Sequence, residues 1–169
     1  MRLIVWLLAA VLVTGCTWGT PKPEPVTDGS KLSSADAQKV IAARAAETVN
    51  AIKAKDLAKL KSLVHPDAGA RFSPYSYVNT STDLVFQAAD FDRPLFAEKR
   101  LYHWGTFDGS GEPINLGFGD YWQRFVYAHD FAAAPQVGYN QFLRGGANST
   151  NNAREIYPTA IFVDYHFPG

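Results

Sequence analysis

An apolar run near the start of the chain decides which residues are available to fold. Leu3 to Val13 are all apolar, follow a basic residue at position 2, and precede Thr14, Gly15 and Cys16. A positive start, an apolar stretch and then small residues are the three parts of a secretory signal. The run is too short for a membrane-spanning helix, which needs roughly 20 apolar residues. We therefore predict that residues 1–15 are a signal peptide that is removed.

The segment Val13-Thr14-Gly15-Cys16 resembles the lipobox of bacterial lipoproteins, in which an aliphatic residue and two small residues precede a lipidated cysteine. The resemblance implies that acyl chains on Cys16 hold the protein to a membrane of the cell envelope, on its periplasmic or outer side. Cys16 is the only cysteine of the chain, so it has no partner for an internal disulfide. Each buried methylene contributes about 0.8 kcal/mol, and two or more chains anchor stably. The alternative is an unmodified thiol behind an ordinary signal peptide.

The residues after the cysteine favour a tether. Residues 19–32 alternate Pro21, Pro23 and Pro25 with charged residues and contain few apolar ones, a composition that stays extended because it buries too little surface to fold. We assign residues 16–32 to the lipidated cysteine and this flexible tether. Residues 33–169 have a length suited to one domain.

The chain is electrically balanced, since its sixteen basic residues match sixteen acidic ones. A surface that binds nucleic acid needs an excess of basic side chains, so we expect no nucleic-acid partner. Aromatic residues make up 14% of the chain and lie mostly after residue 70, among glycines and prolines. This composition favours curved strands around a substantial core.

The spacing of apolar residues predicts three helices. Positions from Ala37 to Ile52 recur at three- and four-residue intervals behind the serines at 33 and 34, as on the buried face of a capped amphipathic helix. A second, short helix covers residues 57–64 and ends before Pro66, because the residue preceding a proline avoids helical backbone. The third covers Phe118 to Val126.

Alternating patterns predict strands at residues 70–78, 101–107 and 159–167. Pro74 confines the first strand to a sheet edge, and Tyr75 and Tyr77 share one of its faces. In the last strand, Asp164 and His166 lie on the face opposite the apolar one. Residues 84–91 fit a helix or a strand, and residues 135–152 are predicted to form a long loop because they are rich in Gly and Asn.

Two helices, the second followed by His-Pro-Asp and then by a Gly-Ala-Arg-Phe-Ser-Pro-Tyr strand, resemble the opening of nuclear-transport-factor-2-like domains. Further segments are similar to a family of uncharacterised bacterial lipoproteins. This resemblance implies an α+β fold, with N-terminal helices packed on a curved, cone-like antiparallel sheet, and no known activity. Relatives continue past the equivalent of Pro168 into further strands, so we expect this sheet to lack its C-terminal strands and to expose an edge. The segments that carry the resemblance are residues 65–67, 71–75, 104–114 and 163–169.

Neither a metal nor a cofactor is expected. Asp108 to Glu112 places oxygens at alternate positions, but a calcium loop needs six to eight ligands and the later ones are missing, so a turn is the better interpretation. The four histidines form no i, i+4 pair and have no thiol partner, so zinc would need a site assembled by tertiary folding alone.

Two hypotheses for function remain. In the first, the domain binds a small ligand or a protein partner without catalysis, in an aromatic concavity lined by Tyr75, Tyr77, His103 and Trp104. In the second, it is a cone-fold hydrolase or isomerase that uses Asp164 with His166, or His103 in their place, as an acid–base pair. We favour a solvated outer face for Asp164 and His166, and burial of these side chains separates the two hypotheses. A third hypothesis is pairing through the exposed edge of strand 159–167.

Overall fold

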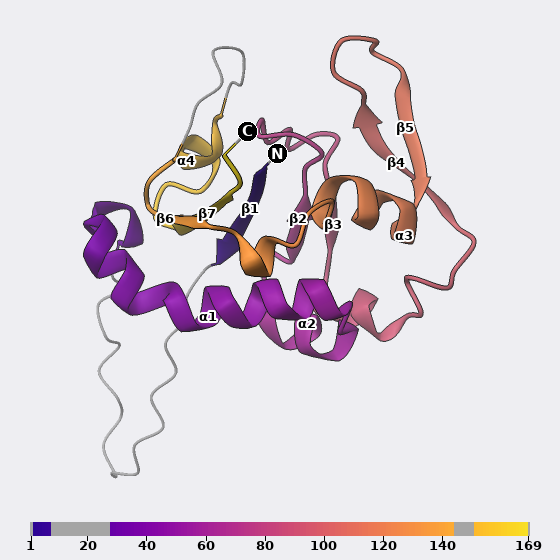
Figure 1. Cartoon of the computed structure of the whole chain (residues 1–169). Helices are drawn as coiled ribbons and strands as arrows, with labels where there is room; N and C mark the ends of the chain where they lie inside the picture. Colours follow the sequence, from indigo (N-terminus) through magenta and orange to yellow (C-terminus); the bar gives the residue numbers. More distant parts are fainter. Residues whose placement is uncertain (1, 8–27, 144–150, 169) are drawn as a thin grey trace.

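The computed structural model describes residues 2–7, 28–143 and 151–168 (Figure 1). Helices and several small antiparallel sheets are both present, so the predicted α+β class is confirmed. Cys16 and the predicted tether up to residue 27 lie outside the described residues. Within the described part of the chain, no helix combines the length and the apolar character needed to cross a membrane.

The two N-terminal helices are those that the apolar spacing predicts. Helix α1 spans Ser34–Ala54, and the Ser33 side chain caps it by accepting a hydrogen bond from Asp36 N at 3.2 Å. The helix ends at Lys55, whose left-handed backbone (φ 54°) stops further helical hydrogen bonding. Helix α2 spans Leu57–Leu63 and is capped by Asp56. Val40 departs from the prediction, because it is 51% exposed while Ile41 occupies the centre of the buried face.

The strands are divided among three small antiparallel sheets instead of one continuous sheet. Strand β7 is the middle strand of the largest sheet, with β6 on one side and β1 on the other. Figure 1 shows this sheet above the first half of α1, with the hairpin of β4 and β5 far from it. The strands are β1 (Arg2–Leu7), β2 (Ala70–Phe72), β3 (Leu84–Phe86), β4 (Leu101–Thr106), β5 (Pro113–Gly117), β6 (Gln136–Tyr139) and β7 (Ile161–His166).

Short helices connect the sheets. The predicted helix at 118–126 is confirmed, with a first half of α-helix and a second half of π-helix. The short helices are η1 (Gly29–Lys31), η2 (Ala88–Asp92), α3 (Phe118–Tyr121), η3 (Trp122–Val126), η4 (Phe131–Ala133) and α4 (Ala153–Ile156).

Three segments differ from the sequence-based expectation. The first predicted strand stops at Phe72, because the Asp83 carboxylate accepts hydrogen bonds from the Ser73 hydroxyl and from Asn79 N, which closes a loop. The predicted loop at 135–152 contains strand β6. Residues 2–7, part of the predicted signal peptide, pair with β7 as strand β1.

An aromatic cluster packs between the β2–β3 and β4–β5 sheets and the helices α3 and η3. Trp104 lies at its centre, completely buried, with its ring stacked on Tyr121 at 3.7 Å between centroids. Its Nε1 donates to Leu116 O at 3.0 Å, so the one polar atom of the side chain is satisfied. The cluster consists of Phe72, Phe86, Trp104, Phe118, Tyr121 and Trp122.

The ordered fold begins slightly before the predicted boundary at residue 33. Gly29 N donates to Thr159 O at 2.9 Å, just ahead of β7. The Asn140 side chain, just after β6, donates from Nδ2 to Gly29 O at 2.7 Å. These bonds fasten the C-terminal end of the predicted tether to the sheet of β6 and β7.

Candidate functional site

Strand β7 is buried on both faces, and one of those faces carries a carboxylate and an imidazole. Ile161, Val163 and Tyr165 pack into the hydrophobic core. The alternation of a strand places Asp164 and His166 on the opposite face. Asp164 is 0% exposed and His166 is 7% exposed. The prediction of a solvated outer face for these two side chains is therefore wrong.

A short loop after β6 covers Asp164. Leu143 N donates to Asp164 Oδ2 at 3.0 Å. The Phe142 ring stacks on Phe162, with centroids 4.2 Å apart and planes 19° apart. From the other side, the Arg154 guanidinium lies 4.5 Å from the centre of the Phe162 ring. The polar face of β7 is thus closed by side chains from this loop and from α4.

Gly138 is the residue that lets the loop fold back so closely. It lies directly opposite Asp164 in the β6–β7 register. A Cβ atom at this position would sit 2.2 Å from Gln141 O, a distance that no side chain tolerates. Asn140 then reverses the chain with a left-handed backbone (φ 50°), and its backbone N donates to Phe162 O at 2.9 Å.

Three polar atoms on this face have no hydrogen-bond partner among the described residues. They are Asp164 Oδ1 and both ring nitrogens of His166, Nδ1 and Nε2. A buried polar atom without a partner costs about 1–3 kcal/mol, and more when the group is charged. Native proteins keep few such atoms, so this pair is the strongest candidate site in the described part of the chain.

The chemistry available to this pair is that of a proton acceptor beside a proton donor. An ionised carboxylate only accepts hydrogen bonds, whereas an imidazole donates, accepts, or donates from both nitrogens when protonated. Asp164 and His166 do not bond to each other, although they share a face. A polar group that enters between or beside them would satisfy both. Because Asp164 is completely buried, a substrate reaches it only if its cover moves.

The predicted ligand-binding residues are spread over several environments. Trp104 belongs to the aromatic cluster, whereas His103 is exposed on the other face of β4 and lies 3.1 Å from Asn115 Oδ1 on β5. Tyr75 is half-buried against Phe125, and its hydroxyl accepts a hydrogen bond from Asp108 N. Tyr77 is 52% exposed. The side chains of Trp104 and His103 therefore lie on opposite faces of β4. His103 also belongs to a different sheet from Asp164 and His166.

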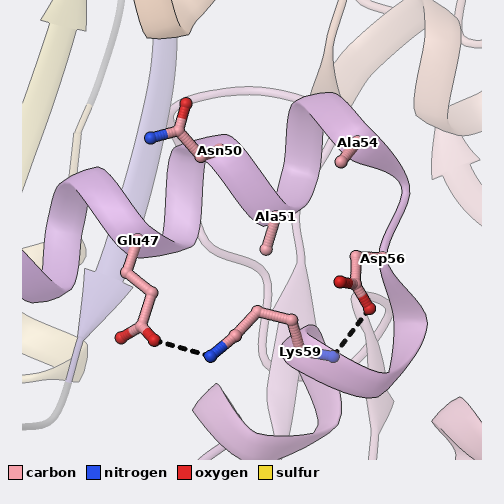
Figure 2. A pocket seen from close by; sticks show the side chains of 6 residues that line it. All are labelled: Glu47, Asn50, Ala51, Ala54, Asp56 and Lys59. Atoms are coloured by element: carbon pink, nitrogen blue, oxygen red, sulfur yellow. Dashed lines mark hydrogen bonds and ion pairs between the residues drawn. The ribbon is translucent and has the colours of Figure 1, made fainter.

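A surface hollow of about 310 Å³ lies where α1 meets α2. Figure 2 shows its charged groups turned toward one another: Glu47 reaches Lys59 Nζ at 2.8 Å, and Asp56 accepts from Lys59 N at 2.9 Å. The Lys59 ammonium lowers the pKa of the Glu47 carboxyl. Since these groups satisfy each other, the hollow has less to offer a ligand than the β7 pair. Its lining consists of Glu47, Asn50, Ala51, Ala54, Asp56 and Lys59.

Two buried groups with shifted pKa values, Asp83 and Tyr121, have structural roles. Burial raises the pKa of the Asp83 carboxyl, which holds the Ser73 to Asn79 loop closed. Burial in the aromatic cluster raises the pKa of Tyr121 far above its usual range. In the described residues, no three His, Cys, Asp or Glu side chains gather closely enough to hold a metal ion.

The sequence gives only one signal for the covering loop. A glycine within a strand indicates a close approach of another chain segment, and Gly138 has that role here. Phe142 and Leu143 carry no such signal, because their contact with β7 depends on the tertiary fold.

Comparison with protein-family models finds no match to this chain. Comparisons with curated proteins and with solved structures find no significant similarity either. The resemblance to bacterial lipoproteins and to nuclear-transport-factor-2-like domains therefore stays a prediction from the sequence.

Proposed function

We propose that this protein is a lipoprotein of the bacterial cell envelope, anchored through acyl chains on Cys16, whose α+β domain binds a ligand or a protein partner without catalysis. The observation that carries the proposal is the lone cysteine directly behind an apolar run and two small residues. An exported domain stabilised by disulfides would carry an even number of cysteines. A single cysteine at this position suits an anchor instead.

The start of the ordered fold supports this arrangement. Eleven residues, 17–27, separate Cys16 from Asp28, the first described residue of the domain. At a maximum of about 3.3–3.6 Å per residue, the span from Cys16 to Asp28 is about 40 Å. An anchored domain would therefore stay within this distance of the membrane. Its attachment point at Gly29 would hold the sheet of β6 and β7 on the side nearest the tether.

The loop that covers Asp164 favours binding over catalysis. A catalytic carboxylate must meet its substrate, and the Leu143 N–H and the Phe142 ring lie over this face of β7. A binding partner that reaches this face has no bond to break there and supplies hydrogen-bonding groups to the atoms that lack them. Satisfying such atoms gives specificity, because a partner without the matching polar groups leaves them unpaired.

Intact mass spectrometry of the protein from a producing bacterial cell tests the anchor. We expect a chain that starts at Cys16 and carries the mass of two or three acyl chains. The Cys16→Ser variant should keep its leader and lose the acyl mass, while Ser33→Ala, a matched change outside the lipobox, should be processed normally. An unmodified Cys16 in the wild-type chain would overturn the proposal.

A second candidate function is acid–base catalysis by Asp164 and His166, favoured by their burial beside aromatic rings. It requires the covering loop to open. Hydrolysis of a panel of chromogenic esters by the wild-type chain should then fall by about 100-fold or more in Asp164→Asn and in His166→Gln, the usual range for a general acid or base. His65→Gln, a change in the turn between α2 and β2, is the control, and equal activity in all four proteins would exclude this function.

A further inference from the structure

Strand β7 has two edges, and in this structure both are occupied. Asn140 N donates to Phe162 O, and Phe162 N donates to Asn140 Oδ1, so the backbone groups of Phe162 point toward the β6 side. Because successive residues of a strand bond alternately to the two sides, Val163 and Tyr165 point toward β1. Residues 2–7 satisfy them there, in a register that pairs Leu3 with Tyr165 and Val5 with Val163.

Removal of the signal peptide takes this neighbour away. The mature chain would then present the backbone N–H and C=O groups of Val163 and Tyr165 at the open edge of a two-stranded sheet of β6 and β7. Open edges of this kind pair readily with another strand. The inference below rests on the proposed function, since it requires that residues 1–15 leave the protein.

We infer that, in the mature protein, β7 of one copy pairs antiparallel with β7 of a second copy, centred on Tyr165. Each Asp164 then lies opposite His166 of the partner subunit. The two copies would form one continuous sheet around a twofold axis. The partner's imidazole would bond to Asp164 Oδ1, while Asp164 Oδ2 keeps its hydrogen bond from Leu143 N.

The charges on β7 select this register. To keep the polar face on one side, the pairing must be centred on a residue and not between two residues. A centre at Asp164 places two carboxylates opposite each other, which is destabilising. A centre at Val163 places Asp164 opposite Phe162 and leaves both polar side chains unsatisfied. Only the centre at Tyr165 brings each carboxylate to an imidazole, and it does so twice by symmetry.

Strand geometry brings this pair within reach. With Tyr165 bonded across the edge, Asp164 and the partner's His166 form a pair without backbone hydrogen bonds, whose Cα atoms lie about 4.5 Å apart. Their Cβ atoms are then about 4.5–5.5 Å apart, close enough for the side chains to bond. Pro168 does not interfere, because the alternation along β7 directs its nitrogen toward the β6 side.

The end of the tether favours the same register. Gly29 N already donates to Thr159 O, just ahead of β7. Pairing centred on Tyr165 uses residues from Val163 to Phe167 and stays clear of this contact. A centre at Val163 would instead bring the partner's Phe167 opposite Thr159. Two copies anchored to one membrane by tethers of about 40 Å also meet at a high effective concentration.

The inference is tested by measuring the mass of the assembly that the processed protein forms after extraction from the membrane in mild detergent. We expect a dimer from sedimentation equilibrium after correction for detergent and acyl chains. His166→Asp places a carboxylate opposite Asp164 of the other copy, and should raise the dissociation constant by about tenfold or more. His166→Gln keeps a hydrogen-bond donor and should remain largely dimeric. His103→Asp makes the same change on β4 and should leave the mass unchanged.

Cysteine cross-linking identifies which residues of the two β7 strands lie opposite each other, and it does not require the His166→Asp variant to fold. The double variant Asp164→Cys, His166→Cys should give a disulfide-linked dimer on a non-reducing gel, since the opposed Cα atoms lie within the 4.4–6.8 Å that a disulfide spans. Either single variant should stay monomeric on the gel. Cross-linking of Asp164→Cys alone would mean a centre at residue 164 and would overturn the inference.

The outcomes separate this inference from the proposed function. A processed, acylated chain that is monomeric overturns the strand pairing and leaves the anchor intact. A dimer that survives His166→Asp unchanged also overturns it, because the charge pairing then has no part in the contact. A chain that keeps residues 1–15 overturns the proposed function, and the inference with it, because β1 then stays on the edge of β7.

Discussion

Trp104 and Asp164 are both completely buried, but the single polar atom of Trp104 is bonded, whereas only one of the two carboxylate oxygens of Asp164 is. Near Trp104, the Tyr102 hydroxyl is also bonded, to Arg93 and Glu98. Trp122 Nε1 is the exception, because it has no partner among the described residues. On β7, a carboxylate oxygen and both nitrogens of one imidazole are left unsatisfied. Ring packing completes the aromatic cluster, whereas the polar face of β7 needs a further polar group to be complete.

The largest expected effect comes from breaking the aromatic cluster. Trp104→Ala should lower the free energy of unfolding by about 3–5 kcal/mol, because it removes a completely buried ring and leaves a cavity. Urea denaturation measures this loss. Leu101→Ala on the same strand is the control, since Leu101 is 68% exposed, and it should change stability by less than about 0.5 kcal/mol.

The next largest effect should come from displacing the cover of the polar face. Gly138→Ala puts a Cβ atom 2.2 Å from Gln141 O, and overpacking of this kind costs about 1–3 kcal/mol. Amide hydrogen exchange at Leu143 should accelerate, because its bond to Asp164 is broken. Gly117→Ala is the matched change, as its nearest contact is 3.8 Å away. Equal effects of the two variants would contradict the tight turn at Gly138.

A smaller effect, a gain in stability, tests whether Asp164 and His166 lack hydrogen-bond partners in the monomer. In the full chain with residues 1–15 retained, His166→Leu should raise the free energy of unfolding by about 1 kcal/mol, because it removes a buried ring whose nitrogens have no partners. Thermal unfolding measures the gain. Tyr102→Phe is the comparison in the other region, and it should lose stability because the Tyr102 hydroxyl is bonded. Destabilisation by His166→Leu would show that His166 is already satisfied.

The smallest effect concerns exposed charges, which belong to neither region. The Lys53 ammonium and the Tyr127 hydroxyl lower the pKa of the Asp130 carboxyl. A carboxyl whose pKa is depressed in the folded state stabilises the fold above its unfolded pKa of about 3.9, and this contribution is lost as the pH falls through the lower folded value. Lys53→Met should therefore flatten the decline of the melting temperature between about pH 5 and pH 2. Lys99→Met should leave that slope unchanged.

The elements set by local patterns could be predicted from the sequence. The apolar spacing of α1, its cap at Ser33 and its stop at Lys55 all depend on neighbouring residues, and so does the alternation of β7. The sequence does not predict strand β6, because the Gly and Asn content of residues 135–152 resembles a loop, although Gly138 and Asn140 serve one tight reversal over the sheet.

The burial of the β7 pair could not be predicted, because it depends on contacts distant in sequence. Leu143 lies 21 residues from Asp164, and nothing in the alternation of 159–167 distinguishes a covered polar face from a solvated one. The early end of β2 has a more local origin, since the Asp83 bonds that end it depend on how residues 73–83 close on themselves.

The position of the indole rings determines what the protein's own fluorescence reports. Of the four tryptophans, Trp104 and Trp122 lie in the aromatic cluster, and Trp6 and Trp18 precede the described domain. If residues 1–15 are removed, Trp6 leaves with them. Emission changes on unfolding will then follow the half of the molecule around β4 and α3. Events at β7, including any association between copies, will need a label placed there to be seen.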